Sequence, residues 1–162
     1  MTFVLLAALA AAPTSAYTPL NLDACEIVSV AHAGEGDWLN RRCPGLNGIT
    51  LFVSEDDARF DVDAGVDNGE WESPTQLNEL GPQVEWRLEG GQPFALIYRY
   101  NIPEAMAGGR SMLAVESIGR EGGPGCLVAL IRATPEANAR AREIADRSAR
   151  NFRCGTDQRI TD

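Results

Sequence analysis

The middle of the chain alternates apolar and polar residues with a period of two, the pattern of half-buried β-strands. Residues 60–64 place Asp61 and Asp63 between apolar residues, which predicts an apolar inner face and a solvated carboxylate face. Residues 84–88 alternate in the same way, and residues 94–100 are apolar on both faces, as a central strand would be. We predict strands over residues 49–53, 60–64, 84–88, 94–100, 112–118 and 126–131.

Turn residues separate these strands. Asn47-Gly48 precedes the first strand and Asn68-Gly69 follows the second, and both dipeptides favour tight turns. The Gly-rich residues 90–93 join two alternating segments, which are expected to form an antiparallel hairpin.

The C-terminal region changes to apolar residues at three- and four-residue spacing, which predicts an amphipathic helix ending near Phe152. Thr134 is a plausible N-cap, Pro135 suits the first helical position, and Gly155 is a natural stop. We therefore predict an α+β domain: an antiparallel sheet of about five to seven strands with a C-terminal helix packed on one face.

Residues 3–12 form an apolar run that is too short to span a membrane and is typical of a secretory signal peptide. Small residues follow Pro13, so we predict a signal peptide over residues 1–16, cut after Ala16, and a single domain over residues 17–162. Two alternatives are a buried N-terminal helix and a lipoprotein signal that ends at Cys25.

The four cysteines, Cys25, Cys43, Cys126 and Cys154, indicate two disulfides in an exported chain. Three pairings are possible, and the spacing favours Cys25–Cys43 and Cys126–Cys154. The second pairing would join a strand to the end of the helix. A zinc site or a catalytic dithiol would require Cys-x-x-Cys pairs, which do not occur. The expected location is the periplasm or the outside of the cell.

Charge narrows the classes of function. The chain has 23 acidic residues and 14 basic ones, all of them Arg, for a net charge of −9. Residues 17–89 carry 15 acids and four Arg, whereas residues 90–162 carry eight acids and ten Arg. This balance excludes nucleic-acid binding through bulk positive charge, and the lack of Lys excludes Schiff-base and P-loop chemistry. One His excludes sites built from several His ligands.

The acidic run after residue 54 raises the question of a calcium site. In an EF-hand loop that begins at Asp61, Asp63, Asp67 and Glu72 would fall at ligand positions. Gly65 replaces a ligand, and Val66 stands where the loop requires Gly, so the pattern fails. The expected role of the Asp56–Asp67 stretch is a solvated strand face and loop, with an irregular calcium site as the alternative.

Other candidate residues are weaker. His32 has no nucleophile partner of a known motif, although Ser29 is near in sequence. Trp86 is expected in the core, whereas Trp71, between two Glu residues, is the tryptophan expected to be exposed; with Trp38 the three could also form a binding platform. Arg99 lies in an apolar strand and is expected to pair with a carboxylate, with substrate binding as the alternative. No catalytic, cofactor-binding or metal-binding residue is assigned.

Several motifs together resemble a group of small exported proteins of Gram-negative bacteria with four cysteines. They are residues 42–45 (RCPG), 54–59 (SEDDAR), 84–88 (VEWRL), 125–129 (GCLVA), 137–142 (ANARAR) and 152–154 (FRC). The group has no assigned activity, so the resemblance implies export and a shared fold but no site residues.

Three functions are compatible with these observations. The favoured one is a non-enzymatic periplasmic binding domain whose acidic half meets a cationic protein or peptide. The alternatives are a hydrolase that uses two carboxylates on a cell-envelope glycan and a structural envelope component. No membrane span and no cofactor are expected, and the oligomeric state is open.

Overall fold

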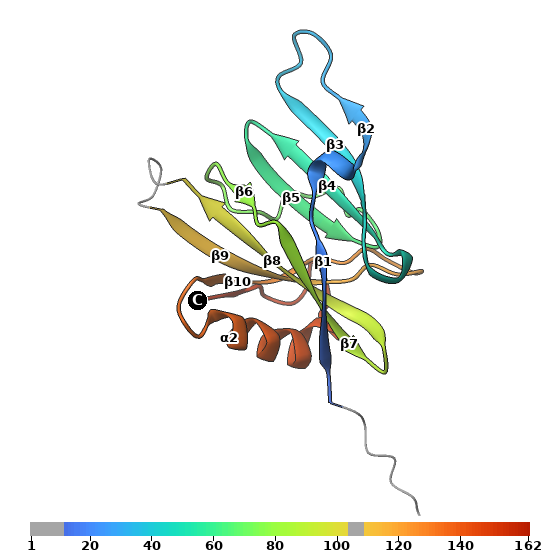
Figure 1. Ribbon diagram of the computed structural model, residues 1–162, viewed down its shortest axis with the longest axis vertical. Helices are drawn as coiled ribbons and strands as arrows, with labels where there is room; N and C mark the ends of the chain where they lie inside the picture. The colour runs from blue at the N-terminus through green and yellow to red at the C-terminus, as the bar shows by residue number, and fades with distance from the viewer. Residues whose placement is uncertain (1–11, 104–108) are drawn as a thin grey trace, which may run out of the picture.

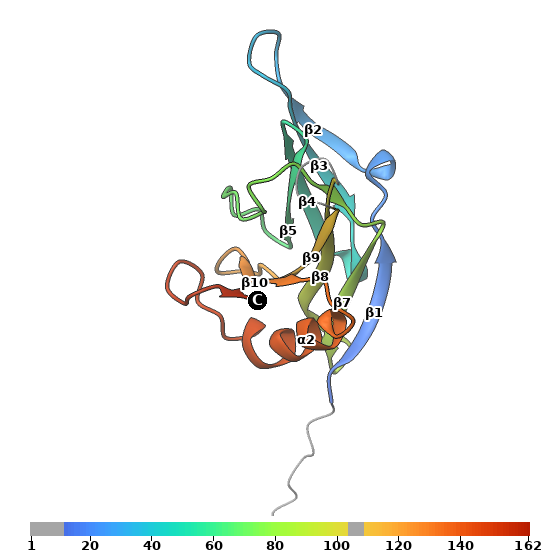
Figure 2. The ribbon, with the colours of Figure 1, turned by 90° about the vertical axis from the view of Figure 1, so that its left-hand side faces the viewer.

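A computed structural model describes residues 12–103 and 109–162. The described chain forms three layers: a small sheet, a larger sheet and a C-terminal helical segment (Figures 1 and 2). This confirms the predicted α+β class. The strands differ from the prediction in number and arrangement, because the described residues form eleven strands divided between two sheets.

The larger sheet has the order β1-β7-β8-β9-β10-β11, with the short β6 beside β8. The predicted hairpin of residues 84–100 is confirmed as β7–β8, and only the last pair, β10 with β11, is parallel. Its strands are β1 Thr14–Pro19, β6 Glu79–Leu80, β7 Gln83–Glu89, β8 Gln92–Ile102, β9 Arg110–Ser117, β10 Leu127–Arg132 and β11 Ile160–Thr161.

The smaller sheet is an antiparallel meander in sequence order, β2-β3-β4-β5. Its strands are β2 Glu26–Val30, β3 Trp38–Pro44, β4 Thr50–Asp56 and β5 Arg59–Ala64. A two-residue turn joins β4 to β5, and both of its residues, Asp57 and Ala58, have positive φ, as tight hairpin turns require. Because β5 is the last strand in this order, it is an edge strand of the sheet.

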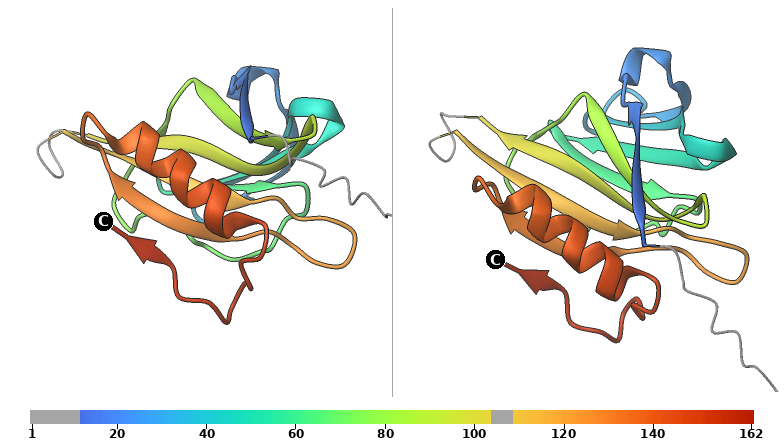
Figure 3. Two further views of the ribbon diagram at one scale, coloured as in Figure 1. Left: turned by 90° about the horizontal axis from the view of Figure 1, so that it is seen from below. Right: turned by 60° about the horizontal axis from the view of Figure 1, so that its bottom comes forward.

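The helical segment is shorter than predicted. It consists of α2 Ala137–Ile144 and one π-helical turn, η3 Ala145–Ala149. The predicted N-cap is wrong, because the carbonyl of Thr134 closes a turn on the N–H of Ala137 and Glu136 takes the cap position. The segment covers one face of the larger sheet, as predicted (Figure 3).

Two apolar cores separate the layers, and β8 contributes to both. Leu96 and Tyr98 face the core between the sheets, where Trp86 is fully buried as predicted. Ala95 and Ile97 face the core under the helix. This alternation explains why the β8 sequence is apolar on both faces.

β1 bears on the predicted signal peptide, although residues 1–11 lie outside the described part of the chain. Thr14, Ser15 and Ala16 pair with β7, and Ser15 bonds the side chains of Glu85 and Arg87. A cut after Ala16 would fall inside this strand. The cleavage position therefore stays a prediction.

Both predicted disulfides are confirmed. Cys25–Cys43 joins the residue after the 3-10 turn Leu22–Ala24 to β3, and Cys126–Cys154 joins the start of β10 to the segment after the helix. They are compatible with an oxidising location outside the cytoplasm. Within residues 12–103 and 109–162, no helix has the length and apolarity needed to cross a membrane.

Candidate functional site: an acidic cleft beside buried carboxyls

The predicted solvated face of β5 is wrong. Asp61 and Asp63 are only 5% and 6% exposed. The loop of residues 65–78 folds back over them, and its backbone N–H groups bond their carboxyls, Glu72 N to Asp61 Oδ1 at 3.2 Å and Asn68 N to Asp63 Oδ2 at 3.4 Å. Alternation along β5 did place both carboxyls on one face, but that face is covered.

The outer edge of β5 meets side chains of the larger sheet. Glu116 of β9 accepts the Ala64 N–H at 2.9 Å, and the Tyr98 hydroxyl of β8 donates to the Val62 carbonyl at 3.3 Å and lies 3.2 Å from Glu116 Oε2. Glu116 is buried at this junction, where it accepts a hydrogen bond from the Ala64 N–H. No neighbouring strand reaches this backbone donor, so the Glu116 carboxyl satisfies it.

Asp61, Asp63 and Glu116 form what we call the buried carboxyl cluster. Burial raises the pKa of Asp61 to about 6. Burial, reinforced by the nearby charge of Asp61, raises the pKa of Asp63 to about 8. Burial likewise holds the pKa of Glu116 well above its usual range. The cluster therefore retains protons at neutral pH that exposed carboxyls have lost.

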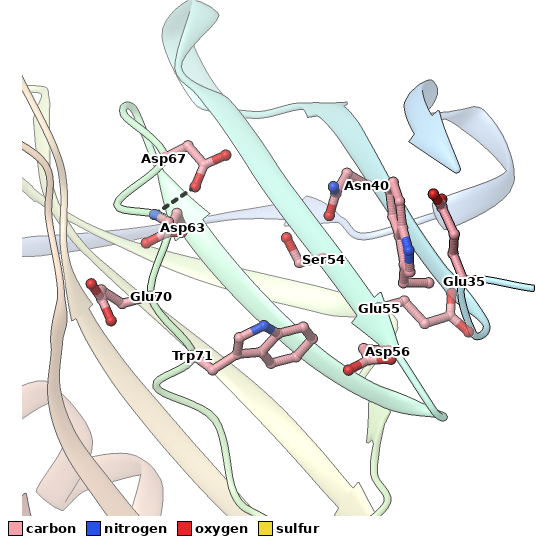
Figure 4. A pocket seen from close by; sticks show the side chains of 11 residues that line it. Glu35, Asn40, Ser54, Glu55, Asp56, Asp63, Asp67, Glu70 and Trp71 are labelled. Carbon is pink, nitrogen blue, oxygen red and sulfur yellow. Dashed lines mark hydrogen bonds between the residues drawn. The ribbon is translucent and has the colours of Figure 1, made fainter. Parts of the chain in front are cut away.

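Asp63 also lines an open cleft of about 400 Å³, which we call the acidic cleft. Figure 4 shows Asp67 and Glu70 at one end and Glu35 at the opposite end, with Trp71 between them. The cleft is lined by the loop before β3, strands β3 to β5 and the loop that covers β5. Its lining residues are Glu35, Trp38, Asn40, Ser54, Glu55, Asp56, Asp63, Asp67, Gly69, Glu70 and Trp71.

Six carboxyls line the acidic cleft, and no described arginine belongs to its lining. Two of these carboxylates form ion pairs with arginines that do not line the cleft: Arg41 lies 2.8 Å from Glu55, and Arg59 lies 3.1 Å from Asp56. Arg59 also stacks 5.5 Å from the centre of the Trp71 ring. The exposed carboxylates of Glu35, Asp67 and Glu70 pair with no arginine among the described residues.

The residues tested as an EF-hand have other partners. Asp67 accepts the Gly69 N–H, and Glu72 binds both the Leu127 N–H and the Arg159 guanidinium at 2.8 Å. Within the described ranges, no group of three or more His, Cys, Asp or Glu side chains could hold a metal ion.

The three tryptophans occupy different environments. Trp71 is 47% exposed, as predicted, while Trp86 is buried away from solvent. Trp38 is half-buried and shares the acidic cleft with Trp71. The burial of Trp86 excludes a platform made of all three tryptophans, and only Trp38 and Trp71 share the cleft.

The other candidates lie outside the cleft. His32 is exposed, and its backbone N–H donates to Glu35. Ser29 accepts a hydrogen bond from Asn40. Arg99 donates to the hydroxyl of Ser111 at 2.8 Å, and the described residues contain no carboxylate paired with it.

Sequence reasoning did not identify Glu116 as a member of the buried carboxyl cluster. It also missed Tyr98 and Tyr100, two tyrosines beside the cluster whose hydroxyls lie 3.2 Å apart. One signal was available, since Glu116 is the acidic residue in the apolar run of residues 112–118. A buried acid needs a partner, but the sequence does not indicate which strand supplies it.

No protein-family model, no curated protein and no solved structure matches this chain. The resemblance to small exported proteins therefore stays an expectation, and functional inference depends on the site itself.

Proposed function

We propose that this chain is an exported, non-enzymatic binding domain whose acidic cleft holds a cationic segment of a protein or peptide, outside the cytoplasm or in the periplasm. The observation that carries the proposal is the composition of the cleft, with six carboxyls, two tryptophans and no arginine among the described lining residues.

The chemistry of the lining supports a guanidinium or ammonium ligand. Exposed carboxylates attract such groups at long range, and aromatic faces hold them at close range. Arg59 stacked on Trp71 is an internal example of that contact. The openness of the cleft suits a side chain presented by a larger partner, and the two disulfides support work in an oxidising space.

Binding of a hexa-arginine peptide, measured by calorimetry at low and high salt, tests the proposal. The triple variant Glu35→Gln, Asp67→Asn, Glu70→Gln removes three exposed charges from the cleft and keeps their acceptor oxygens. Exposed ion pairs contribute about 0.2–1 kcal/mol each, so we expect the affinity to fall about tenfold.

A matched control removes the same charge elsewhere, through the exposed residues Glu26, Glu121 and Glu136 changed to Gln. The control is expected to bind as the unchanged chain does. Equal losses in both variants would show that net charge, and not the cleft, attracts the peptide. Affinity that does not change with salt would also count against the proposal.

One observation favours a hydrolase as a second candidate. Asp63 is a buried acid that lines the cleft and has a pKa of about 8. A general acid in glycoside hydrolysis needs a proton at neutral pH. A panel of cell-envelope glycans tests this alternative: activity abolished by Asp63→Asn would support it, and a chain inert toward every glycan would rule it out.

A further inference from the structure

We propose that the acidic cleft takes up its cation in exchange for a proton, which leaves the carboxyl of Asp63. This inference concerns the regulation of the proposed binding site and rests on the proposed function. Its physical basis is the contact between the cleft, which is open, and the buried carboxyl cluster, which is not.

Asp63 belongs to both the acidic cleft and the buried carboxyl cluster. The residue is only 6% exposed, yet it lines the acidic cleft. Oδ2 accepts the long bond from Asn68, and Oδ1 has no hydrogen-bond partner among the described residues. Because no buried side-chain oxygen of the described residues lacks a partner, the unbonded Oδ1 keeps access to the open cleft, where it is placed to meet a ligand.

Acidic groups face Asp63 from its own strand, from the covering loop and from the larger sheet. They are Asp61 on β5, Asp67 and Glu72 on the covering loop, and Glu116 on β9, with Tyr98 and Tyr100 on β8. The cations nearby are Arg159, which bonds Glu72, and Arg59, which bonds Asp56. Neither cation bonds Asp63, so its negative form has no cationic partner among the described residues.

A guanidinium in the cleft would supply that partner. An opposite charge within about 4–6 Å lowers the pKa of a carboxyl by about 1–3 units. Because the pKa of Asp63 is about 8 without a ligand, a shift of that size means that binding at pH 7 expels about 0.4–0.9 of a proton. The same coupling requires affinity to rise with pH.

The test uses the hexa-arginine peptide and calorimetry from pH 6 to pH 9. Arginine stays charged throughout this range, so any pH dependence comes from the protein. Heats measured in two buffers with different ionisation enthalpies give the number of protons released. We expect affinity to rise about tenfold or more from pH 6 to pH 9, with about 0.4–0.9 of a proton released per peptide at pH 7.

Two variants separate the cluster from the cleft. Asp63→Asn keeps the acceptor for Asn68 and is expected to match the unchanged chain at pH 6, to bind at least tenfold more weakly at pH 9, and to release almost no proton. Glu70→Gln removes an exposed carboxylate from the same cleft and is expected to weaken binding at every pH without changing the pH dependence. Circular dichroism establishes that each variant is folded.

The possible failures are distinguishable. Peptide binding with an affinity that is constant from pH 6 to pH 9 and without proton release would overturn the coupling and leave the proposed function standing. Proton release that persists in Asp63→Asn would overturn the assignment to Asp63. A folded chain that binds no peptide at any pH would overturn the proposed function and the coupling together.

Discussion

Replacing Asp63 with Asn is expected to reduce the pH dependence of folding between pH 5 and pH 8. In the folded chain the pKa of Asp63 is about 8, whereas an unfolded Asp titrates near its ordinary value of 3.8. The folded state therefore holds a proton that the unfolded state releases throughout this window. Its stabilising effect is complete below about pH 4 and is lost as pH rises toward 8.

The magnitude follows from proton linkage. One proton held only by the folded state lowers the free energy of unfolding by about 1.4 kcal/mol for each pH unit. Between pH 5 and pH 7, Asp63 alone should account for about 3 kcal/mol. Asp61, with a pKa of about 6, adds to the slope in the lower half of the window. Glu116, whose pKa burial also raises, adds a slope of its own in both chains, so the difference between the two chains isolates the contribution of Asp63.

Urea unfolding, followed by the fluorescence of the buried Trp86, measures this free energy at each pH. The unchanged chain should lose stability from pH 5 to pH 8, and Asp63→Asn should show a slope smaller by about one proton. Asp157→Asn is the matched control: Arg153 bonds this partly exposed carboxylate and lowers its pKa, so the slope should not change. A flat profile in the unchanged chain, or equal slopes in both chains, would show that Asp63 is ionised in the fold.

Three further predictions concern stability, each measured by urea unfolding at pH 7. Arg87→Ala removes a buried guanidinium that Asp146 bonds with both oxygens, at 2.8 and 2.9 Å, and should cost about 3–5 kcal/mol; a loss below about 1 kcal/mol would contradict the role of this pair in holding the helix on the sheet. Cys154→Ser opens a disulfide that closes 28 residues and should cost about 2–4 kcal/mol, and reduction of the unchanged chain should have no smaller effect. A chain beginning at Tyr17 lacks half of β1 and the Ser15 hydroxyl that bonds Arg87, so it should be about 1–3 kcal/mol less stable than one beginning at Pro13; equal stability, with a mature terminus at Tyr17 by mass spectrometry, would favour the predicted cut.

Local periodicity accounts for the part of the fold that could be predicted. All six predicted strands are present within about three residues of their predicted ends, because each carries its own alternation or continuous run of apolar residues. β1 and β3 carried weaker signals: β1 overlaps the predicted leader, and β3 contains two adjacent arginines. The division into two sheets depends on pairing between distant segments, which alternation does not specify.

The candidate site was less predictable for the same reason. Alternation placed Asp61 and Asp63 on one face of β5, but their burial requires the loop of residues 65–78 to return over that face. Glu116 reaches the pair only through the packing of β9 against β5, 52 residues away along the chain. Only the exposure of Trp71, set by its polar neighbours, was visible locally.

The side chains that occupy the outer edge of β5 also affect how copies of this chain meet one another. An exposed strand edge is a template on which a second chain can add a strand and begin an aggregate. Here Glu116, Tyr98 and Asn78 bond the Ala64 N–H, the Val62 carbonyl and the Phe60 N–H. These bonds leave an incoming strand no free backbone partner at those three positions.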